Sequence, residues 1–246
     1  MRSSTYEKRE FVYNYLKECC HSSGILETTE GEFEDVISID ASSLYPFIEI
    51  AFKFMVEDPY VDFYYGRAYS GKWDYFPVAF RRRIIEFYKK KEEGTKGKFY
   101  KLCINSLSGK SISAYEINKD NTNKNNFLAP QHGFQVIEIG RRILMEMVSK
   151  LEEIDCRILE LDTDGIKCQG DIEKIRELLK EENRAVIDRL LKSGLTFKEA
   201  SCGIGQWKLE YKAEKFIQRS PKHYSYCVNG EWTHKGEREE IFEIGY

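Results

Sequence analysis

Three aspartates occupy positions from which their carboxylates could act together. Asp40 ends a short β-branched run, and Asp162 and Asp164 are separated by one residue. Successive side chains of a strand point to opposite faces, so a spacing of two directs Asp162 and Asp164 to the same side. An oxygen-rich group of this kind suits Mg²⁺ or Mn²⁺. Two such ions about 4 Å apart can clamp the attacking and leaving oxygens of an in-line phosphoryl transfer.

Each part of this pattern also has an ordinary structural explanation. A lone Asp-x-Asp in a turn usually serves the turn, because the aspartate side chain accepts hydrogen bonds from nearby backbone N–H groups. A single aspartate before a helix usually caps that helix. The two parts together favour a cation site, and the helix expected after Asp40 adds backbone N–H groups that suit a phosphate.

Charge is distributed unevenly along the chain, although the formal net charge is only −3. Residues 24–62 contain ten acidic residues and one basic residue, whereas residues 81–110 contain ten basic and three acidic ones. A second basic stretch, 206–222, has five basic and two acidic residues. Charge runs are usually solvated faces. The alternative is an acidic, cation-binding region beside segments that bind phosphates.

The elements that must position these residues form a mixed layout of helices and strands. Apolar spacing predicts helices over 5–20, from Ser43 onward, and over 77–93, 98–113, 134–151 and 171–193. A buried strand is predicted at 35–40, a hairpin around 157–168, and a β-rich end from Thr196, with Asn229-Gly230 as a hairpin turn. Residues 21–34 and 119–126 are expected to be loops, and 60–75 irregular.

Composition limits the class of protein. The 246 residues are 41% hydrophobic and 14% aromatic, which is too rich for intrinsic disorder. No apolar run is long enough to span a membrane, and the N-terminus lacks the apolar region of a secretory signal. Seven cysteines form no Cys-x-x-Cys pair, which favours free thiols in a reducing compartment. We therefore expect a cytoplasmic protein without membrane partners.

Four segments resemble, in the same order, motifs of family B DNA polymerases. Residues 40–48, Asp-Ala-Ser-Ser-Leu-Tyr-Pro-Phe-Ile, resemble Asp-x-x-Ser-Leu-Tyr-Pro-Ser-Ile, with Phe47 as the departure. Residues 101–109 resemble the fingers motif Lys-x-x-x-Asn-Ser-x-Tyr-Gly, with Ser108 in place of tyrosine. Residues 160–165 are similar to Tyr-x-Asp-Thr-Asp-Ser, and residues 222–224 match Lys-x-Tyr. The resemblance covers roughly residues 35–226.

The resemblance implies an α+β fold with a polymerase palm, which is an antiparallel sheet with helices on one face. It also implies a helical-hairpin fingers insertion and a vestigial thumb. The expected parts are an N-terminal helix and lead-in loop (1–34), the first part of the palm (35–76), the fingers (77–113), the second part of the palm (114–212), and a primer-grip β segment with a remnant thumb (213–246). The protein-primed polymerases of phages and linear plasmids look most similar. About 35 residues precede the first motif, so no proofreading exonuclease is expected.

The resemblance also assigns catalytic roles. Asp40 and Asp164 would hold two Mg²⁺ ions, or Mn²⁺, with help from the backbone carbonyl of Ala41, and Asp162 would assist them. The segment Ser43, Leu44 and Tyr45 would bind the incoming triphosphate, and Tyr45 would exclude a 2′-hydroxyl. Further triphosphate contacts would come from Lys101, from Lys89 or Lys91, and from Asn105. Residues contacting the primer and DNA would be Ser106, Gly109, Lys222 and Tyr224.

The expected function is template-directed DNA polymerisation from deoxynucleotides (dNTPs) on a DNA template-primer, in viral or mobile-element replication. Two alternatives remain open. One is a primer-synthesising or untemplated nucleotidyltransferase. The other is a non-catalytic nucleic-acid-binding subunit of a split polymerase. A terminal or priming protein, or a separate exonuclease or thumb subunit, would be a further partner. A loss of Asp40 or Asp164 would favour the non-catalytic alternative, and both are present.

Overall fold

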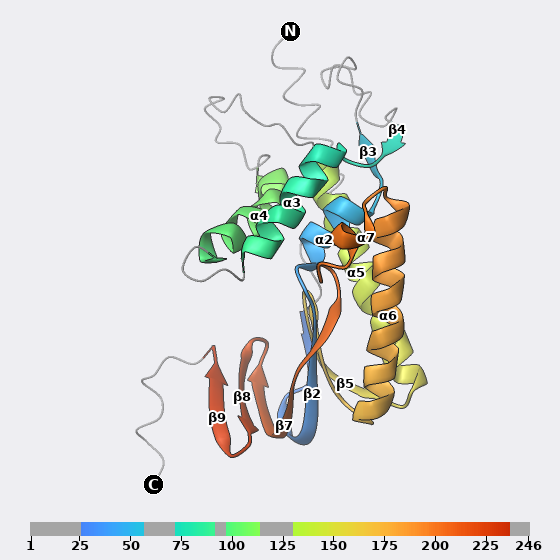
Figure 1. The fold of residues 1–246 in the computed structure, drawn as a ribbon. Coiled ribbons are helices and arrows are strands. Elements are labelled where there is room, and N and C mark those ends of the chain that lie inside the picture. The colour runs from blue at the N-terminus through green and yellow to red at the C-terminus, as the bar shows by residue number, and fades with distance from the viewer. Residues whose placement is uncertain (1–25, 57–71, 92–96, 114–129, 237–246) are drawn as a thin grey trace, which may run out of the picture. The chain divides into compact units, whose positions relative to one another are not determined.

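A computed structural model describes residues 26–56, 72–91, 97–113 and 130–236 of the chain (Figure 1). These residues form two compact units, each built from separate stretches of sequence. The first contains Ser43–Gly140 and Ala185–Gly205, and the second contains Gly24–Ser42, Arg141–Arg184 and Gln206–Tyr246. The helix expected at 5–20 and the loop expected at 119–126 lie outside the described residues.

The second unit is built on one antiparallel sheet with the strand order β1-β5-β6-β2-β7-β8-β9. Strand β2, the long central strand, pairs with β6 on one side and with β7 on the other. The Asn229-Gly230 turn joins β8 to β9 with φ angles of 53° and 79°, as a two-residue hairpin requires. The strands are β1 (Leu26–Thr28), β2 (Gly31–Ala41), β5 (Arg157–Asp162), β6 (Gly165–Gln169), β7 (Trp207–Ser220), β8 (His223–Val228) and β9 (Glu231–Lys235).

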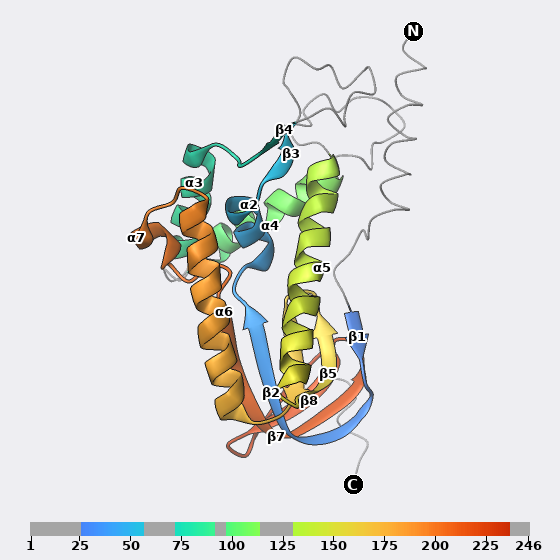
Figure 2. The same ribbon diagram turned by 90° about the vertical axis from the view of Figure 1, so that its right-hand side faces the viewer.

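The two faces of this sheet carry different residues. On one face Ile37 and Ile39 lie opposite Cys168 and Ile166, and all four are buried. Figure 2 shows the parts of α5 (Pro130–Glu153) and α6 (Ile172–Lys192) that belong to this unit lying over that face. The helices contribute a second set of buried apolar side chains, Leu144, Met147, Leu151, Ile175 and Leu179.

The opposite face combines a small aromatic core with polar side chains. Val36, Leu159, Ala213 and Phe216 are buried there, with several half-buried tyrosines packed against them. The rings of Tyr211 and Tyr226 stack at 4.1 Å. Because side chains alternate along β2, Ser38 and Asp40 point to the face opposite that of Ile37 and Ile39.

The first unit is helical. It contains α2 (Leu44–Ala51), α3 (Val78–Lys90), α4 (Gly97–Ser113), α7 (Phe197–Ala200) and a small hairpin of β3 (Phe54–Val56) and β4 (Lys72–Asp74). Helices α3 and α4 pack together through Phe87 and Tyr100, whose ring centroids are 5.4 Å apart. Arg81 is buried, and its guanidinium donates to the carbonyls of Phe76 and Ser193 at 2.8 and 2.6 Å. Arg81 is therefore a structural residue of this unit.

Most predicted elements are confirmed, including the strand before Asp40, the helix after Ser43, the helices of 77–113 and the hairpin around Asp162. The loop predicted at 21–34 is wrong, because it contains β1 and the first part of β2. This part of β2 alternates glutamate with other residues and therefore lacks an apolar pattern. It is held by pairing with β7, in which Phe33 lies opposite Phe216.

The pairing of β2 with β7 also explains much of the charge distribution. Glu34 lies opposite Lys215, and the Lys212 ammonium is 2.7 Å from the Asp35 carboxylate. Part of the acidic run and most of the second basic stretch are thus neighbouring strands, β2 and β7, which are joined by the Asp35–Lys212 ion pair. Glu34 and Asp35 lie on a solvated strand. Within the described part of the chain, no helix is both long and apolar enough to cross a bilayer.

Candidate functional site

Backbone pairing in the second unit brings Asp40, Asp162 and Asp164 together. Asp40, near the end of β2, lies opposite Gly165, the first residue of β6. The Ala41 N–H donates to the Asp164 carbonyl at 2.8 Å, and the Asp164 N–H donates to the Asp162 carbonyl at 2.6 Å. The tight turn between β5 and β6 is therefore fixed against the end of β2.

Asp164 reaches this position through the turn and not through strand alternation. Thr163, which precedes it, has a φ of 59°, in the left-handed region, so the alternation expected from the sequence does not continue beyond Asp162. Burial, followed by the nearby charges of Asp40 and Asp162, raises the pKa of Asp164 to about 7. The three carboxylates therefore lie within electrostatic reach of one another. A turn at Thr163, and not the strand alternation expected from the sequence, brings Asp164 there.

The raised pKa of Asp164 predicts how stability depends on pH in the absence of divalent metal. Between about pH 4 and pH 7 the folded state binds a proton at Asp164 that the unfolded chain has lost, so the free energy of unfolding falls as pH rises. A difference of about three pH units corresponds to roughly 4 kcal/mol at most. We expect urea unfolding in EDTA to show this decrease between pH 4 and pH 8, and Asp164→Asn to lose most of it. Asp188→Asn, at an exposed position on α6, should keep the wild-type slope.

The predicted Mg²⁺ site offers two main carboxylates, Asp40 and Asp164. Among the residues that the structure describes, no group of three or more His, Cys, Asp or Glu side chains could hold a metal ion by itself. Mg²⁺ is usually held by one or two carboxylates together with substrate phosphates. Asp40 and Asp164, crowded and partly desolvated, would gain from a dication that offsets their mutual repulsion. A Cβ at Gly165 would lie 3.7 Å from the Asp40 Oδ1 atom, an ordinary contact, so the serine of the family motif would also fit here.

Lys222 and Tyr224 lie beside these carboxylates in the same unit. The Lys222 ammonium is 3.3 Å from Asp162 Oδ1. Tyr224 is half-buried, and burial, followed by the Glu160 charge, raises its pKa to about 12. Asp162 is thus paired with a lysine, and its assisting role stays a prediction.

The first unit contains the predicted triphosphate segment. Ser43 adopts a φ of 54° immediately before α2, and its side chain makes no capping hydrogen bond. Instead the Ser43 Oγ accepts a hydrogen bond from the Lys91 ammonium at 3.1 Å. Leu44 is buried, so only its backbone could contact a ligand. Tyr45 is half-buried against Gly140, where a Cβ would lie only 2.9 Å from the Tyr45 Cε1 atom.

The structure separates the candidate lysines. Lys90 is paired with Glu86 at 2.8 Å, whereas Lys89 is exposed on α3. Lys91 is the member of this trio whose ammonium reaches Ser43, and it also lies 4.1 Å from the centroid of the Tyr88 ring. Lys91 is therefore the best placed of the three to act with the Ser43–Tyr45 segment.

The candidates on α4 lie along one helix of the first unit. Lys101 and Asn105 are exposed, and the Ser106 hydroxyl donates to the Leu102 carbonyl at 2.7 Å, within its own helix. Gly109 lies further along α4. The roles of these α4 residues stay predictions.

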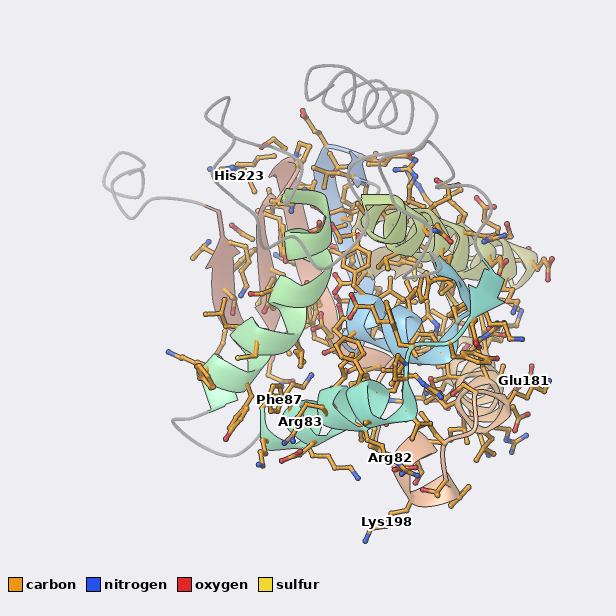
Figure 3. All side chains as sticks on the ribbon, turned by 90° about the horizontal axis from the view of Figure 1, so that it is seen from above. Arg82, Arg83, Phe87, Glu181, Lys198 and His223 are labelled. Carbon is orange, nitrogen blue, oxygen red and sulfur yellow. The ribbon has the colours of Figure 1, made fainter. Side chains whose placement is uncertain are left out.

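Several basic residues of 81–110 have structural partners. Figure 3 shows Arg82 extending from α3 towards α7, where it pairs with Glu199 at 2.7 Å. Arg83 pairs with Glu86 at 2.7 Å along α3. These contacts, with the buried Arg81, leave a smaller set of cations for a ligand than the sequence suggests.

Four residues that contact the predicted site residues were not predicted from the sequence to belong to the site. Gly140 packs on Tyr45, and Glu160, Lys167 and Gln218 are buried beside Lys222 and Tyr224. Two features of the sequence pointed weakly to these residues. Glu160 is a charged residue where the Asp-Thr-Asp motif has tyrosine, and Lys167 is a lysine in a short strand with buried apolar neighbours.

The fold is similar to that of DNA polymerases. Phi29 DNA polymerase complexed with single-stranded DNA matches with a TM-score of 0.59 and 15% sequence identity, over 94% of this chain and 55% of that chain. Phi29 DNA polymerase complexed with primer-template DNA matches with a TM-score of 0.57 and 13% identity, over 91% and 54%. The family B DNA polymerase of the archaeon Pyrobaculum calidifontis matches with a TM-score of 0.50 and 16% identity, over 87% and 28%.

These identities show a distant, polymerase-like fold. The chain spans about half the length of the Phi29 polymerase chains and less than a third of the archaeal one. No family model matches the sequence, and no curated protein sequence gives a significant match.

Proposed function

We propose that this chain is a template-directed DNA polymerase that transfers deoxynucleotides to a primer 3′-hydroxyl, in the replication of a virus or mobile element. The observation that carries the proposal is the convergence of Asp40, Asp162 and Asp164 at adjacent strand ends, in a fold similar to that of DNA polymerases. The viral or mobile-element setting rests on the motif resemblance to the protein-primed branch.

In this proposal Asp40 and Asp164 hold two Mg²⁺ ions, with the carbonyl of Ala41 as a further oxygen. When bound, the ions would lower the cost of the negative charge that develops on the transferred phosphoryl group. The carboxylates would have to be ionised, and the raised pKa of Asp164 places the loss of its proton near neutral pH. Bound substrate and ions would therefore favour the deprotonated form of Asp164.

The Ser43–Tyr45 segment would bind the triphosphate. The first N–H groups of a helix have no partner within the helix, and its N-terminus favours negative charge. Lys91 would neutralise phosphate charge from the same segment, with Lys101 and Asn105 as further contacts.

Lys222 and Tyr224 would bind the primer terminus. Their unit also carries the three aspartates, so a primer held by Lys222 would place its 3′-hydroxyl beside the carboxylates. The Lys222 ammonium is compact and flexible, which suits a phosphate contact. Positioning and electrostatic stabilisation would supply most of the catalysis.

Primer extension by the purified chain tests the proposal. The reaction contains a labelled primer-template, Mg²⁺ and the four dNTPs, and the products are resolved on a sequencing gel. We expect template-directed extension that stops when EDTA is added. If the order of the added nucleotides does not depend on the template sequence, the result would instead support an untemplated nucleotidyltransferase. Binding of primer-template without any extension would support a non-catalytic subunit.

Lys91→Met is expected to weaken dNTP binding more than Lys89→Met does. The Lys91 ammonium reaches Ser43 Oγ, whereas Lys89 is exposed on the same helix and has the same charge. Removing one phosphate contact by a charged group should raise the KM for dNTP about tenfold. Steady-state extension at varied dNTP concentration measures it, and Lys89→Met is the matched control. Equal effects of the two substitutions would show that general charge, and not the contact with Ser43, is what matters.

A further inference from the structure

Three buried polar side chains lie beneath the predicted primer-binding residues. Glu160 is 1% exposed, Lys167 is 7% exposed and Gln218 is 3% exposed. Glu160 of β5 and Lys167 of β6 lie opposite each other and form an ion pair. The Gln218 amide, from β7, donates to Glu160 Oε1 at 3.2 Å. The pair is thus tied to three strands of the sheet.

This cluster holds the turn between β7 and β8. The Gln218 amide also donates to the Ser220 carbonyl at 2.7 Å, and the Lys222 backbone N–H donates to Glu160 Oε1 at 3.5 Å. Lys222 has a φ of 64°, in the left-handed region that side-chain-bearing residues rarely adopt. A conformation of this kind persists only where surrounding contacts hold it.

Two carboxylates on one strand therefore hold Lys222 at both ends. Glu160 accepts from its backbone N–H, and Asp162, two residues further along β5, pairs with its ammonium at 3.3 Å. A spacing of two on a strand puts both carboxylates on the same face. The first contact fixes the backbone of Lys222, and the second directs its ammonium towards Asp162.

The same ion pair supports Tyr224. The Lys167 ammonium lies 4.0 Å from the centroid of the Tyr224 ring, within the range of a cation–π contact. The Tyr224 ring also packs on Phe216, with ring centroids 5.3 Å apart. Lys167 thus joins the ring of Tyr224 to the carboxylate that holds Lys222.

We propose that Glu160, Lys167 and Gln218 are positioning residues that fix Lys222 and Tyr224 for the primer 3′ terminus. A buried ion pair adds little net stability compared with apolar residues of similar size, because both charges are desolvated. An apolar pair could fill this space, but it could not accept the Lys222 N–H. The inference rests on the proposed function for the identity of the ligand, which is the primer strand. The positioning itself rests only on the contacts of this sheet.

Two double variants separate positioning from folding. Glu160→Leu with Lys167→Met replaces the pair by apolar side chains, which the fold should tolerate. Glu160→Lys with Lys167→Glu keeps an ion pair but removes the acceptor for the Lys222 N–H. We expect both to fold, to weaken primer-template binding about tenfold or more, and to raise the KM for primer-template more than that for dNTP. The matched control is Glu182→Gln with Lys150→Met, which removes an ion pair between α6 and α5 in the same unit.

Amide hydrogen exchange of residues 219–224 provides a measurement that does not depend on catalysis. We expect exchange of the Lys222 amide to become faster in both double variants and to stay unchanged in the control. Wild-type exchange in both variants would overturn the inference, whatever the enzyme does. Faster exchange combined with wild-type affinity for primer-template and an unchanged KM would also overturn it, because the cluster would then be only structural. If exchange and DNA binding change as expected but wild type never extends a primer, the proposed function fails while the positioning role stands.

Discussion

Asp164→Asn or Asp40→Asn is expected to abolish nucleotide incorporation while the protein stays folded. Each substitution removes a negative charge needed to hold two dications against a triphosphate. The loss should be about 10³-fold or more in turnover, because charge stabilisation in a preorganised site is usually the largest catalytic contribution. Single-turnover extension of a labelled primer with Mg²⁺ measures it.

The same substitutions should not destabilise the metal-free protein. The charges of Asp40 and Asp162 disfavour ionisation of Asp164, so a neutral amide in its place relieves repulsion. At pH 8 in EDTA, Asp164→Asn should unfold at the same urea concentration as wild type or at a higher one. Asp188→Asn, on the exposed side of α6, should leave both extension and stability unchanged. Full activity in Asp164→Asn would rule out the two-metal assignment, and unfolding of the variant would show that the carboxylate is structural.

Tyr45→Ala is expected to admit ribonucleotides. The motif resemblance places the sugar of the incoming nucleotide against Tyr45, and loss of the ring would open space for a 2′-hydroxyl. Rejection of a substrate that carries one additional hydroxyl is worth about 10²-fold, so the ratio of kcat/KM for dNTP to that for rNTP should fall by up to this amount. Single-nucleotide insertion with matched dNTP and rNTP concentrations gives the ratio.

Gly140 provides a second test of whether Tyr45 discriminates between dNTP and rNTP. A Cβ at this position would lie 2.9 Å from the Tyr45 Cε1 atom, so Gly140→Ala must displace the ring. We expect Gly140→Ala to change the dNTP to rNTP ratio in wild type and to have little further effect in Tyr45→Ala, since coupled neighbours are not additive. Glu138→Ala, at an exposed position on the same helix, is the control. Additive effects, or an unchanged ratio in Tyr45→Ala, would show that Tyr45 is only a core aromatic residue.

The two units contribute different parts of the proposed chemistry. The predicted metal ligands and primer contacts belong to the second unit, whereas Ser43, Tyr45 and Lys91 belong to the first unit.

The sequence by itself determined the elements that carry strong local patterns. The buried strand before Asp40, the helix after Ser43 and the hairpin around Asp162 follow from β-branched runs, apolar spacing and turn residues. Asp40, Asp162 and Asp164 could be predicted to lie together, because one ends a predicted strand and the other two flank a short predicted turn. Motif order then related these residues to a polymerase, and the fold is similar to that class.

Only the tertiary structure decided which charges act together. The sequence left open whether Glu34 and Asp35 belong to a solvated face or to a cation-binding region. They face lysines of β7, which are more than 170 residues away in the sequence. Three consecutive lysines, at 89–91, are equivalent in the sequence, and the chain at the C-terminal end of α3 brings the Lys91 ammonium to Ser43. In the sequence, Glu160 and Lys167 look like ordinary strand residues. Strand pairing brings them into contact with Lys222 and Tyr224. Local patterns encode the elements, whereas these ionic contacts depend on the register of strands and helices distant in the sequence.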